Sequence, residues 1–568
     1  MSLPRMAARA WCRRVRCGCA CVIPVWVWLS IFSGTISAQD PESSGDQNTI
    51  RGTVVNAVTH LPVARALVHS SDDRYAMLSD GDGHFEFASS SGRQVWLLAR
   101  KPGFLGDRNT GRATQASSDS EITIALTPES IIKGRVSTNT GETIPGIEVE
   151  LLTRQVRDGY ARWTAAGTVQ TKSDGSFRFA ELGSASYKIT THEFMDNDPV
   201  VNGTGAPNYG FPPVYFPAAS EFSGGATIDL AAGQTFEANL TITDQQYYPV
   251  RIPVVIGDSN GEMNAGMAGM DIRVKLQGQS EPGYSLGYNA EMHRIEGQLP
   301  NGNYTVEAHA FGQDSTSGEV NLRVAGAPVE GRALVLEEDS SVTLQVKEEF
   351  TEDTRSFAAN GGDAQHPYLV RGPQAYFYPR LEPADDFAPW GGGAVRPPGD
   401  SSNATIVIQN VFPGRYWLRL NTGRGYVASA TMGGMDLLHQ PFDVGAASNV
   451  PIQVTLRDDM ARLDGTVAST TSQSAMGSAS GSQYAWVYCV PVGDGPGRFQ
   501  ERAVPPEQKF SFPSLPPGTY RVMAFASRKQ DLPYLDAEAM RAYDTKGQVI
   551  QLTGGQSASV QLQVIPDE

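Results

Sequence analysis

Two short motifs in this sequence contain residue types that bind metal ions. Asp80-Gly-Asp-Gly83 carries two carboxylates around a glycine, and such hard oxygen ligands suit calcium. The corresponding segment Ser173-Asp-Gly-Ser176 has only one carboxylate, and Asp-Gly supplies the positive φ of a two-residue hairpin turn. The full spacing of an EF-hand is absent. We therefore expect a β-hairpin turn at both places and no bound calcium.

The second motif, His293-Arg-Ile-Glu296, has the His-x-x-Glu spacing that zinc carboxypeptidases use for two ligands. An alignment of internal repeats places it over Lys509–Phe512, a hairpin strand. Because the side chains of a strand alternate between faces, His293 and Glu296 are expected on opposite sides, which excludes zinc. The other histidines are scattered without ligand spacing, and no phosphate-binding loop or dinucleotide fingerprint occurs. We predict no catalytic, cofactor-binding or metal-binding residues, no cofactor, and a protein that is not an enzyme.

The best candidates for ligand recognition are aromatic residues in irregular insertions. One insertion, Asn197–Pro217, contains four closely spaced rings, and a second contains one tryptophan: Tyr209, Phe211, Tyr215, Phe216 and Trp390. Aromatic faces that are exposed on loops stack against sugar rings. The prolines between these rings favour the opposite interpretation, in which the loop packs onto its own domain. Both interpretations stay open at this stage.

A short cassette recurs four times: a hydrophobic residue, a turn, then Gly or Ala followed two residues later by Tyr. Its tyrosines, which lie 117, 112 and 104 residues apart, are Tyr187, Tyr304, Tyr416 and Tyr520. This spacing is the length of one small domain, so the chain is predicted to be a string of similar β-modules. A tyrosine that opens a late strand beside a tight turn bends back to bond a nearby backbone group, as in the tyrosine corner of Greek-key sandwiches. We expect this structural role for all four.

The first two modules share an ordered set of motifs. Ile50-Arg-Gly-Thr-Val-Val55 is followed by a proline turn, an Asp-Gly hairpin and Phe-Glu-Phe87, and Ile132-Lys-Gly-Arg-Val136 begins the same order that ends at Phe-Arg-Phe179. This set resembles the carboxypeptidase regulatory-like family, a transthyretin-like β-sandwich related to collagen-adhesin B-type repeats. The resemblance implies a sandwich in each module and no catalytic residues. In modules three to five only the second half of this pattern is recognisable.

The predicted fold class is therefore all-β, a tandem array of Greek-key transthyretin-like or Ig-like β-sandwiches. The expected order is a signal peptide (1–38), a linker (39–48), module one (49–128), module two (129–245), module three (246–339), module four (340–458) and module five (459–568). The first two modules are those that resemble the carboxypeptidase regulatory-like family. The junctions are about four to six residues long, which is too short for free tumbling. A semi-rigid rod is expected.

The N-terminus has the features of an export signal. Five arginines precede an apolar stretch from about Gly18 to Phe32, and Ile36-Ser-Ala38 provides a signal-peptidase site. The alternative is an uncleaved membrane anchor, and both readings place the remainder outside the cytoplasm. Four of the five cysteines lie in this segment, which leaves Cys489 as a buried core residue without a disulfide partner.

The charge and the modular organisation together limit the function. The net charge of −16 becomes −21 without the five N-terminal arginines, which argues against nucleic acid as a partner. We expect an exported, non-enzymatic bacterial protein, periplasmic, outer-surface or extracellular, that acts as a structural or adhesive spacer of the cell envelope. One alternative is a carbohydrate- or peptide-binding protein that uses its aromatic insertions, with neutral glycans or envelope proteins as partners. Another is a non-catalytic accessory subunit of a secreted enzyme or transporter. No membrane span is expected in the mature chain.

Overall fold

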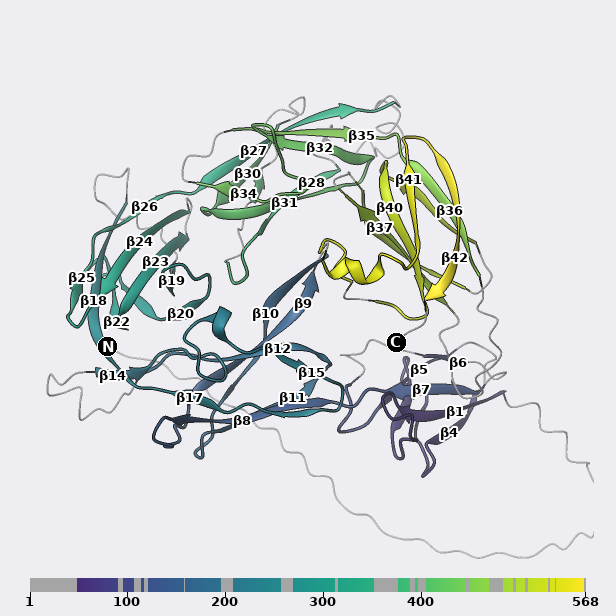
Figure 1. Ribbon diagram of the computed structural model, residues 1–568, viewed down its shortest axis with the longest axis horizontal. Coiled ribbons are helices and arrows are strands. Elements are labelled where there is room, and N and C mark those ends of the chain that lie inside the picture. The colour runs from purple at the N-terminus through teal and green to yellow at the C-terminus, as the bar shows by residue number, and fades with distance from the viewer. Residues whose placement is uncertain are drawn as a thin grey trace, which may run out of the picture.

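The structure is a computed structural model. It describes residues 48–89, 95–106, 114–116, 121–157, 159–195, 208–256, 269–311, 315–351, 376–388, 394–396, 405–445, 450–468, 484–493, 497–505, 509–529, 532–536 and 538–565. Their regular secondary structure is almost entirely β-strand (Figure 1), with short 3-10 helices at Phe222–Gly224 and Ala539–Tyr543. The all-β tandem sandwich fold predicted from the sequence is confirmed. No described helix is long and apolar enough to span a membrane.

Modules one and two each consist of two facing sheets. In module one the sheets have the orders β4-β1-β7 and β3-β2-β5-β6. Its strands are β1 (Asn48–Asn56), β2 (Leu67–Ser70), β3 (Ala76–Leu78), β4 (His84–Ser89), β5 (Val95–Arg100), β6 (Thr114–Ala116) and β7 (Ile122–Leu126). In module two the orders are β10-β9-β12-β15 and β11-β8-β16, with β17 also on β8. Its strands are β8 (Ser130–Thr138), β9 (Glu148–Arg157), β10 (Tyr160–Gln170), β11 (Ser176–Leu182), β12 (Ala185–Thr191), β13 (Phe194–Met195), β14 (Asn208–Phe211), β15 (Ile228–Leu230), β16 (Thr235–Glu237) and β17 (Leu240–Ile242).

Module three shares a sheet with module two. In that sheet β13 pairs with β14, and β14 pairs with β18, the first strand of module three. Its strands are β18 (Gln245–Ile256), β19 (Gly269–Leu276), β20 (Pro282–Tyr284), β21 (Leu286–Asn289), β22 (Arg294–Pro300), β23 (Gly302–Phe311), β24 (Thr316–Val324), β25 (Val329–Glu330) and β26 (Leu334–Glu338). The insertion of module two thus joins the two modules through backbone hydrogen bonds.

Modules four and five repeat the sandwich plan. The strands of module four are β27 (Ser340–Glu349), β28 (Phe377–Pro383), β29 (Ala394–Arg396), β30 (Thr405–Val411), β31 (Gly414–Thr422), β32 (Tyr426–Met432), β33 (Met435–Asp436), β34 (Phe442–Val444) and β35 (Ile452–Arg457). Those of module five are β36 (Ala461–Ala468), β37 (Ala485–Val492), β38 (Gln500–Val504), β39 (Lys509–Leu515), β40 (Gly518–Phe525), β41 (Gln548–Leu552) and β42 (Ser557–Ile565).

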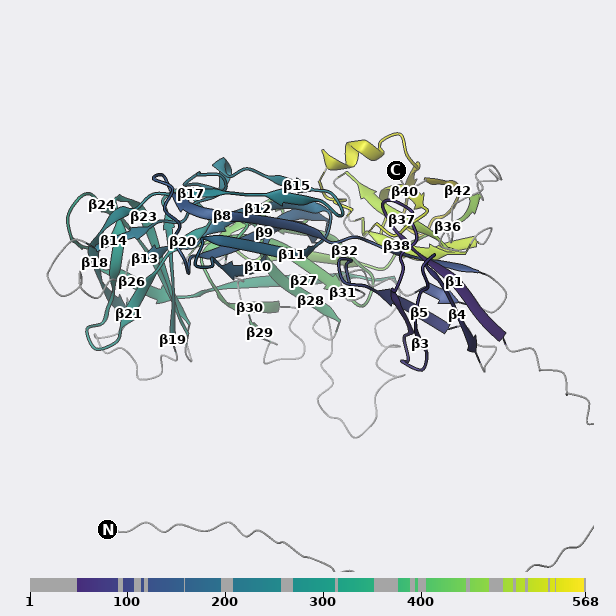
Figure 2. The ribbon, with the colours of Figure 1, turned by 90° about the horizontal axis from the view of Figure 1, so that it is seen from below.

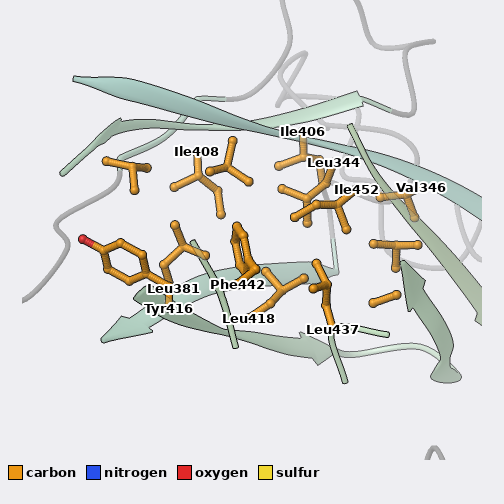
Figure 3. Close-up of a cluster of buried hydrophobic side chains, with 14 of the residues drawn as sticks. Leu344, Val346, Leu381, Ile406, Ile408, Tyr416, Leu418, Leu437, Phe442 and Ile452 are labelled. Carbon is orange, nitrogen blue, oxygen red and sulfur yellow. The ribbon is translucent and has the colours of Figure 1, made fainter. Parts of the chain in front are cut away.

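The cores follow from strand alternation. In β35, Ile452, Val454 and Leu456 are buried while the intervening residues face outward, which is the period-two pattern of a strand with one buried face. They meet Tyr416 and Phe442 from the opposite sheet of module four (Figure 3). Each of the five modules has a buried cluster of this kind.

The four recurring tyrosines form the predicted corners. Each is at most 5% exposed, and each hydroxyl donates to the carbonyl oxygen four residues earlier in the chain. The four bonds are Tyr187 to Gly183 (3.0 Å), Tyr304 to Pro300 (2.9 Å), Tyr416 to Phe412 (2.9 Å) and Tyr520 to Pro516 (2.7 Å). The structural interpretation of the cassette is therefore confirmed, because the hydroxyl group is used internally.

Modules two to five close into a ring, with module one attached to module two (Figure 1). Modules two and three are joined by the pairing of β14 with β18. Modules three and four touch through the rings of His309 and Phe412, whose centroids are 4.4 Å apart. Modules four and five are joined by the hydrogen bond from the Tyr426 hydroxyl to Asp459. The ring closes where the backbone amide of Leu535 donates to the Gly159 carbonyl oxygen at 3.0 Å.

The predicted semi-rigid rod is therefore wrong. The short junctions restrict tumbling, but they do not set the angle between modules. The hairpin β9–β10 points into the centre of the ring and contacts modules four and five there (Figure 1). In the view from below, modules three and five lie at opposite ends of the assembly (Figure 2).

Candidate binding pocket between modules two and three

A cavity of about 540 Å³ lies where module two meets module three. Module two contributes β9, the end of β12 and part of the insertion, module three contributes β19 and β20, and Phe387 comes from module four. The volume is in the range of pockets that hold small ligands. Its lining residues are Gly146, Glu148, Glu150, Leu152, Gln170, Thr190, Thr191, His192, Glu193, Phe194, Pro213, Tyr215, Arg273, Glu281, Pro282, Gly283, Tyr284, Ser285 and Phe387.

Two of the four carboxylates in this lining hold a histidine. Glu148 and Glu150 are two residues apart on β9, so both project from the same face of the strand. His192 Nε2 lies 2.9 Å from Glu150 Oε2, and its Nδ1 lies 3.9 Å from Glu148 Oε1. The hydrogen bond to Glu150 and the charges of both carboxylates raise the pKa of His192.

Glu193 is a carboxylate of the pocket with one oxygen sealed from solvent. Its Oε2 accepts a hydrogen bond from the backbone amide of Ser285 at 2.9 Å. Burial raises the pKa of Glu193 to about 7, against the lowering effect of that amide. Its Oε1 and the hydroxyl of Tyr247, a residue only 2% exposed, are both sealed from solvent, and the interaction between these two side chains lowers the pKa of Glu193 and raises that of Tyr247. The charge of Glu193 adds to burial in raising the pKa of Tyr247.

The cations around the pocket are already engaged. Arg273 donates from Nη2 to the carbonyl oxygen of Phe387 at 2.7 Å. Nearby Lys188 donates from Nζ to the carbonyl oxygens of Phe222 (2.6 Å) and Gly225 (2.8 Å), and its Nζ lies 4.1 Å from the centre of the Phe222 ring. Burial lowers the pKa of Lys188, and the charge of Glu281 partly opposes this effect. The lining therefore carries more negative than positive charge.

The acidic turns occupy the places predicted for them. Asp80 Oδ1 accepts the amides of Asp82 (3.0 Å) and His84 (2.8 Å), and Gly83 has φ of 78°. In the matching turn, Asp174 Oδ1 accepts the amide of Ser176 at 3.0 Å. No group of three or more His, Cys, Asp or Glu side chains that could hold a metal ion occurs among the described residues.

His293 and Glu296 are not brought together as ligands. His293 lies in the turn before β22 with φ of 48°, while Glu296 Oε1 accepts from Asn289 Nδ2 at 2.7 Å and its Oε2 accepts from Arg294 Nε at 2.6 Å. Cys489 is fully buried, and burial raises its pKa to about 12, so it lies in the core as a protonated thiol.

The sequence Gly257-Asp-Ser-Asn-Gly261 has the Gly-x-Ser-x-Gly spacing of a hydrolase nucleophile elbow. It lies outside the described residues, between β18 and β19. A nucleophile elbow joins a strand to a helix at the top of an α/β sheet, whereas both flanking elements here are strands of a β-sandwich. The surrounding fold therefore does not fit that role.

The aromatic residues of the insertion are placed differently from one another. Tyr215 is 8% exposed and meets the Phe222 ring edge to face, with centroids 5.7 Å apart. Phe211 and Phe216 are partly buried against the core of module two. Tyr209 is 43% exposed. Trp390 lies outside the described residues.

Comparisons with known proteins give distant structural likenesses. No family model matches the chain, and no curated protein matches it. The Bacillus anthracis TIE protein aligns at 9% identity and TM-score 0.16 over 51% of this chain and 50% of its own. A streptococcal ancillary pilin aligns at 10% identity and TM-score 0.19 over 51% of this chain and 99% of its own. The full-length RrgB pilus protein of Streptococcus pneumoniae aligns at 10% identity and TM-score 0.15 over 77% of this chain and 98% of its own. The function of this chain must therefore be argued from its own residues.

Proposed function

We propose that this chain is an exported, non-enzymatic β-sandwich protein that acts as a structural or adhesive component of a bacterial cell envelope. The observation that carries the proposal is the closed arrangement of modules two to five, made by side-chain and backbone contacts between modules far apart in sequence. A closed ring presents several sandwich faces on one rigid platform. It reaches a shorter distance than five modules laid end to end, so a platform is favoured over a long spacer.

The internal use of the polar groups supports a role without catalysis. The tyrosine hydroxyls are taken up by corner bonds, and the turn carboxylates by backbone amides. The N-terminal arginines followed by an apolar stretch support export.

Fractionation of cells that produce the full chain tests the proposal. The protein is expected in the envelope or the medium, and a variant with the arginines before residue 17 replaced by serine is expected in the cytoplasm. Recovery of the unaltered chain in the cytoplasm contradicts export. Adhesion of cells with and without the gene, to each other and to host matrix, tests the envelope role. Normal adhesion and normal envelope integrity without the protein contradict it.

A further inference from the structure

We propose that the pocket between modules two and three binds an alkylammonium group, as in a diamine or the side chain of a peptide lysine. The site is independent of the envelope role proposed above. Glu148, Glu150, Glu193 and Glu281 line one cavity from separate strands and loops of two modules. Their neighbours Arg273 and His192 are already bonded to Phe387 and Glu150. Four glutamates face one arginine and one histidine in this lining, so the cavity keeps an excess of negative charge even when both of those side chains are counted as cations.

The distribution of the carboxylates favours an organic cation over a metal ion. No three acidic or histidine side chains among the described residues converge as metal ligands. The cavity, at about 540 Å³, is also much larger than a single ion requires. The lining also contains apolar surface from Leu152, Phe194, Pro213 and the ring of Tyr284. An ammonium group on a hydrocarbon stem matches such a lining, because the stem packs on apolar and aromatic surface while the charge meets carboxylates.

Two further features of this junction point the same way. Glu193, whose Oε1 is sealed from solvent, interacts with the Ser285 amide and the Tyr247 hydroxyl but with no cationic side chain among the described residues, so a ligand ammonium would supply its counter-charge. Lys188 shows that the junction already accommodates one ammonium group, between two carbonyl oxygens and the face of Phe222. A ligand ammonium in the pocket would repeat that chemistry with carboxylates in place of carbonyls.

Calorimetric titration of the full mature chain at about 150 mM salt tests the proposal, because this ionic strength screens loose attraction to an acidic surface. The probes are 1,5-diaminopentane, trilysine, triarginine and N,N′-diacetyl-1,5-diaminopentane, which is uncharged. Diaminopentane or trilysine is expected to bind with one site per chain, and the diacetyl compound is not. Binding of diaminopentane indicates a free amine as the ligand, whereas binding of trilysine alone indicates a peptide.

The decisive comparison is between two double variants with the same net charge. Glu150→Gln with Glu281→Gln alters the pocket, and Glu237→Gln with Glu319→Gln removes two exposed carboxylates outside it. The pocket variant is expected to bind at least about tenfold more weakly, and the control variant as the unaltered chain does. Equal binding by both variants, binding of triarginine alone, or no binding of any charged probe overturns the proposal. Melting curves of both variants establish that the module two and three transitions are retained.

Discussion

The guanidinium group of Arg162 in module two lies 3.4 Å from the carboxylate of Glu382 in module four, and its Nη1 donates to the carbonyl oxygen of Pro383 at 2.6 Å. Glu382 also accepts from Arg419 Nε at 2.5 Å, so one carboxylate is shared by two arginines. All three side chains are at most 16% exposed. The rings of Tyr160 and Trp417, with centroids 5.0 Å apart and planes tilted by 30°, lie beside this triad. These residues dock the β9–β10 hairpin on module four.

Replacing Glu382 by alanine is expected to weaken this docking. It removes the carboxylate that the buried guanidinium groups of Arg162 and Arg419 share, and breaking such a pair costs about 3–5 kcal/mol. Small-angle X-ray scattering should show a larger radius of gyration as the ring opens. Arg51→Ala removes an ion pair whose side chains are 65% and 56% exposed, and it serves as the control without effect. An unchanged scattering curve for Glu382→Ala would show that the triad does not hold the ring.

The tip of the hairpin offers a second test of ring closure. Gly159 has φ of 87°, and a Cβ there would lie 2.8 Å from the Tyr534 ring and 2.9 Å from Leu535 Cγ. Gly159→Ala should therefore separate modules two and five. Gly141 is the matched control, because its φ is 86° and its Cβ would meet nothing within 4 Å. Both variants carry the same backbone strain, so only Gly159→Ala should lose a cross-link engineered between modules two and five. If both variants lose the cross-link to a similar extent, the cause is backbone strain in the turn and not the contact with module five.

Tyr520→Phe should lower the stability of module five by about 1 kcal/mol, because it removes the corner hydrogen bond and leaves the Pro516 carbonyl oxygen without that donor. The melting transition of module five, followed by calorimetry, measures the change. Tyr484→Phe is the control, since this tyrosine is 39% exposed. A module five transition that melts at the same temperature in Tyr520→Phe and in the unaltered chain contradicts the corner role.

The raised pKa of Glu193 predicts that the stability of module two depends on pH. Its pKa is raised to about 7 from the ordinary 4.5, so the folded state holds a proton that the unfolded state has released between these values. The stability that this group contributes is present below pH 4.5 and is lost as the pH rises through about 7, by on the order of 3 kcal/mol. Glu193→Gln should remove this slope in urea unfolding at pH 5 and pH 8. Equal slopes in variant and unaltered chain would falsify the assignment.

Substitution of the two tyrosines of the insertion, Tyr209 and Tyr215, distinguishes a packing role from a role in ligand binding. Tyr215→Ala should destabilise module two by about 3–5 kcal/mol, because its ring is 92% buried. Tyr209→Ala should leave stability unchanged, since the ring is 43% exposed. If the insertion binds neutral glycans, Tyr209→Ala loses retention on insoluble glycans while it melts normally. Equal retention of Tyr209→Ala and the unaltered chain rules out this ring as a glycan contact.

Local patterns determined much of the fold. Alternating hydrophobic residues predict the strands, Asp-Gly pairs predict the hairpins at Gly83 and Gly175, and a Gly or Ala two residues before Tyr predicts all four corners. Each of these features is decided within about ten residues, by φ preferences and by which face of a strand is buried. A single sequence therefore suffices to predict them.

Only the tertiary structure decided how the modules close and where a pocket lies. Arg162 and Glu382 are 220 positions apart, and neither belongs to a motif that would indicate its partner. Glu150 and Glu281 likewise come to one cavity from different modules, and the sequence between them gives no sign of it. The aromatic insertion shows the same limit within one module, because Tyr209 and Tyr215 have similar local sequences and opposite exposure. Such outcomes depend on the angles between modules, which arise from the sum of many distant contacts and not from any local preference of the chain.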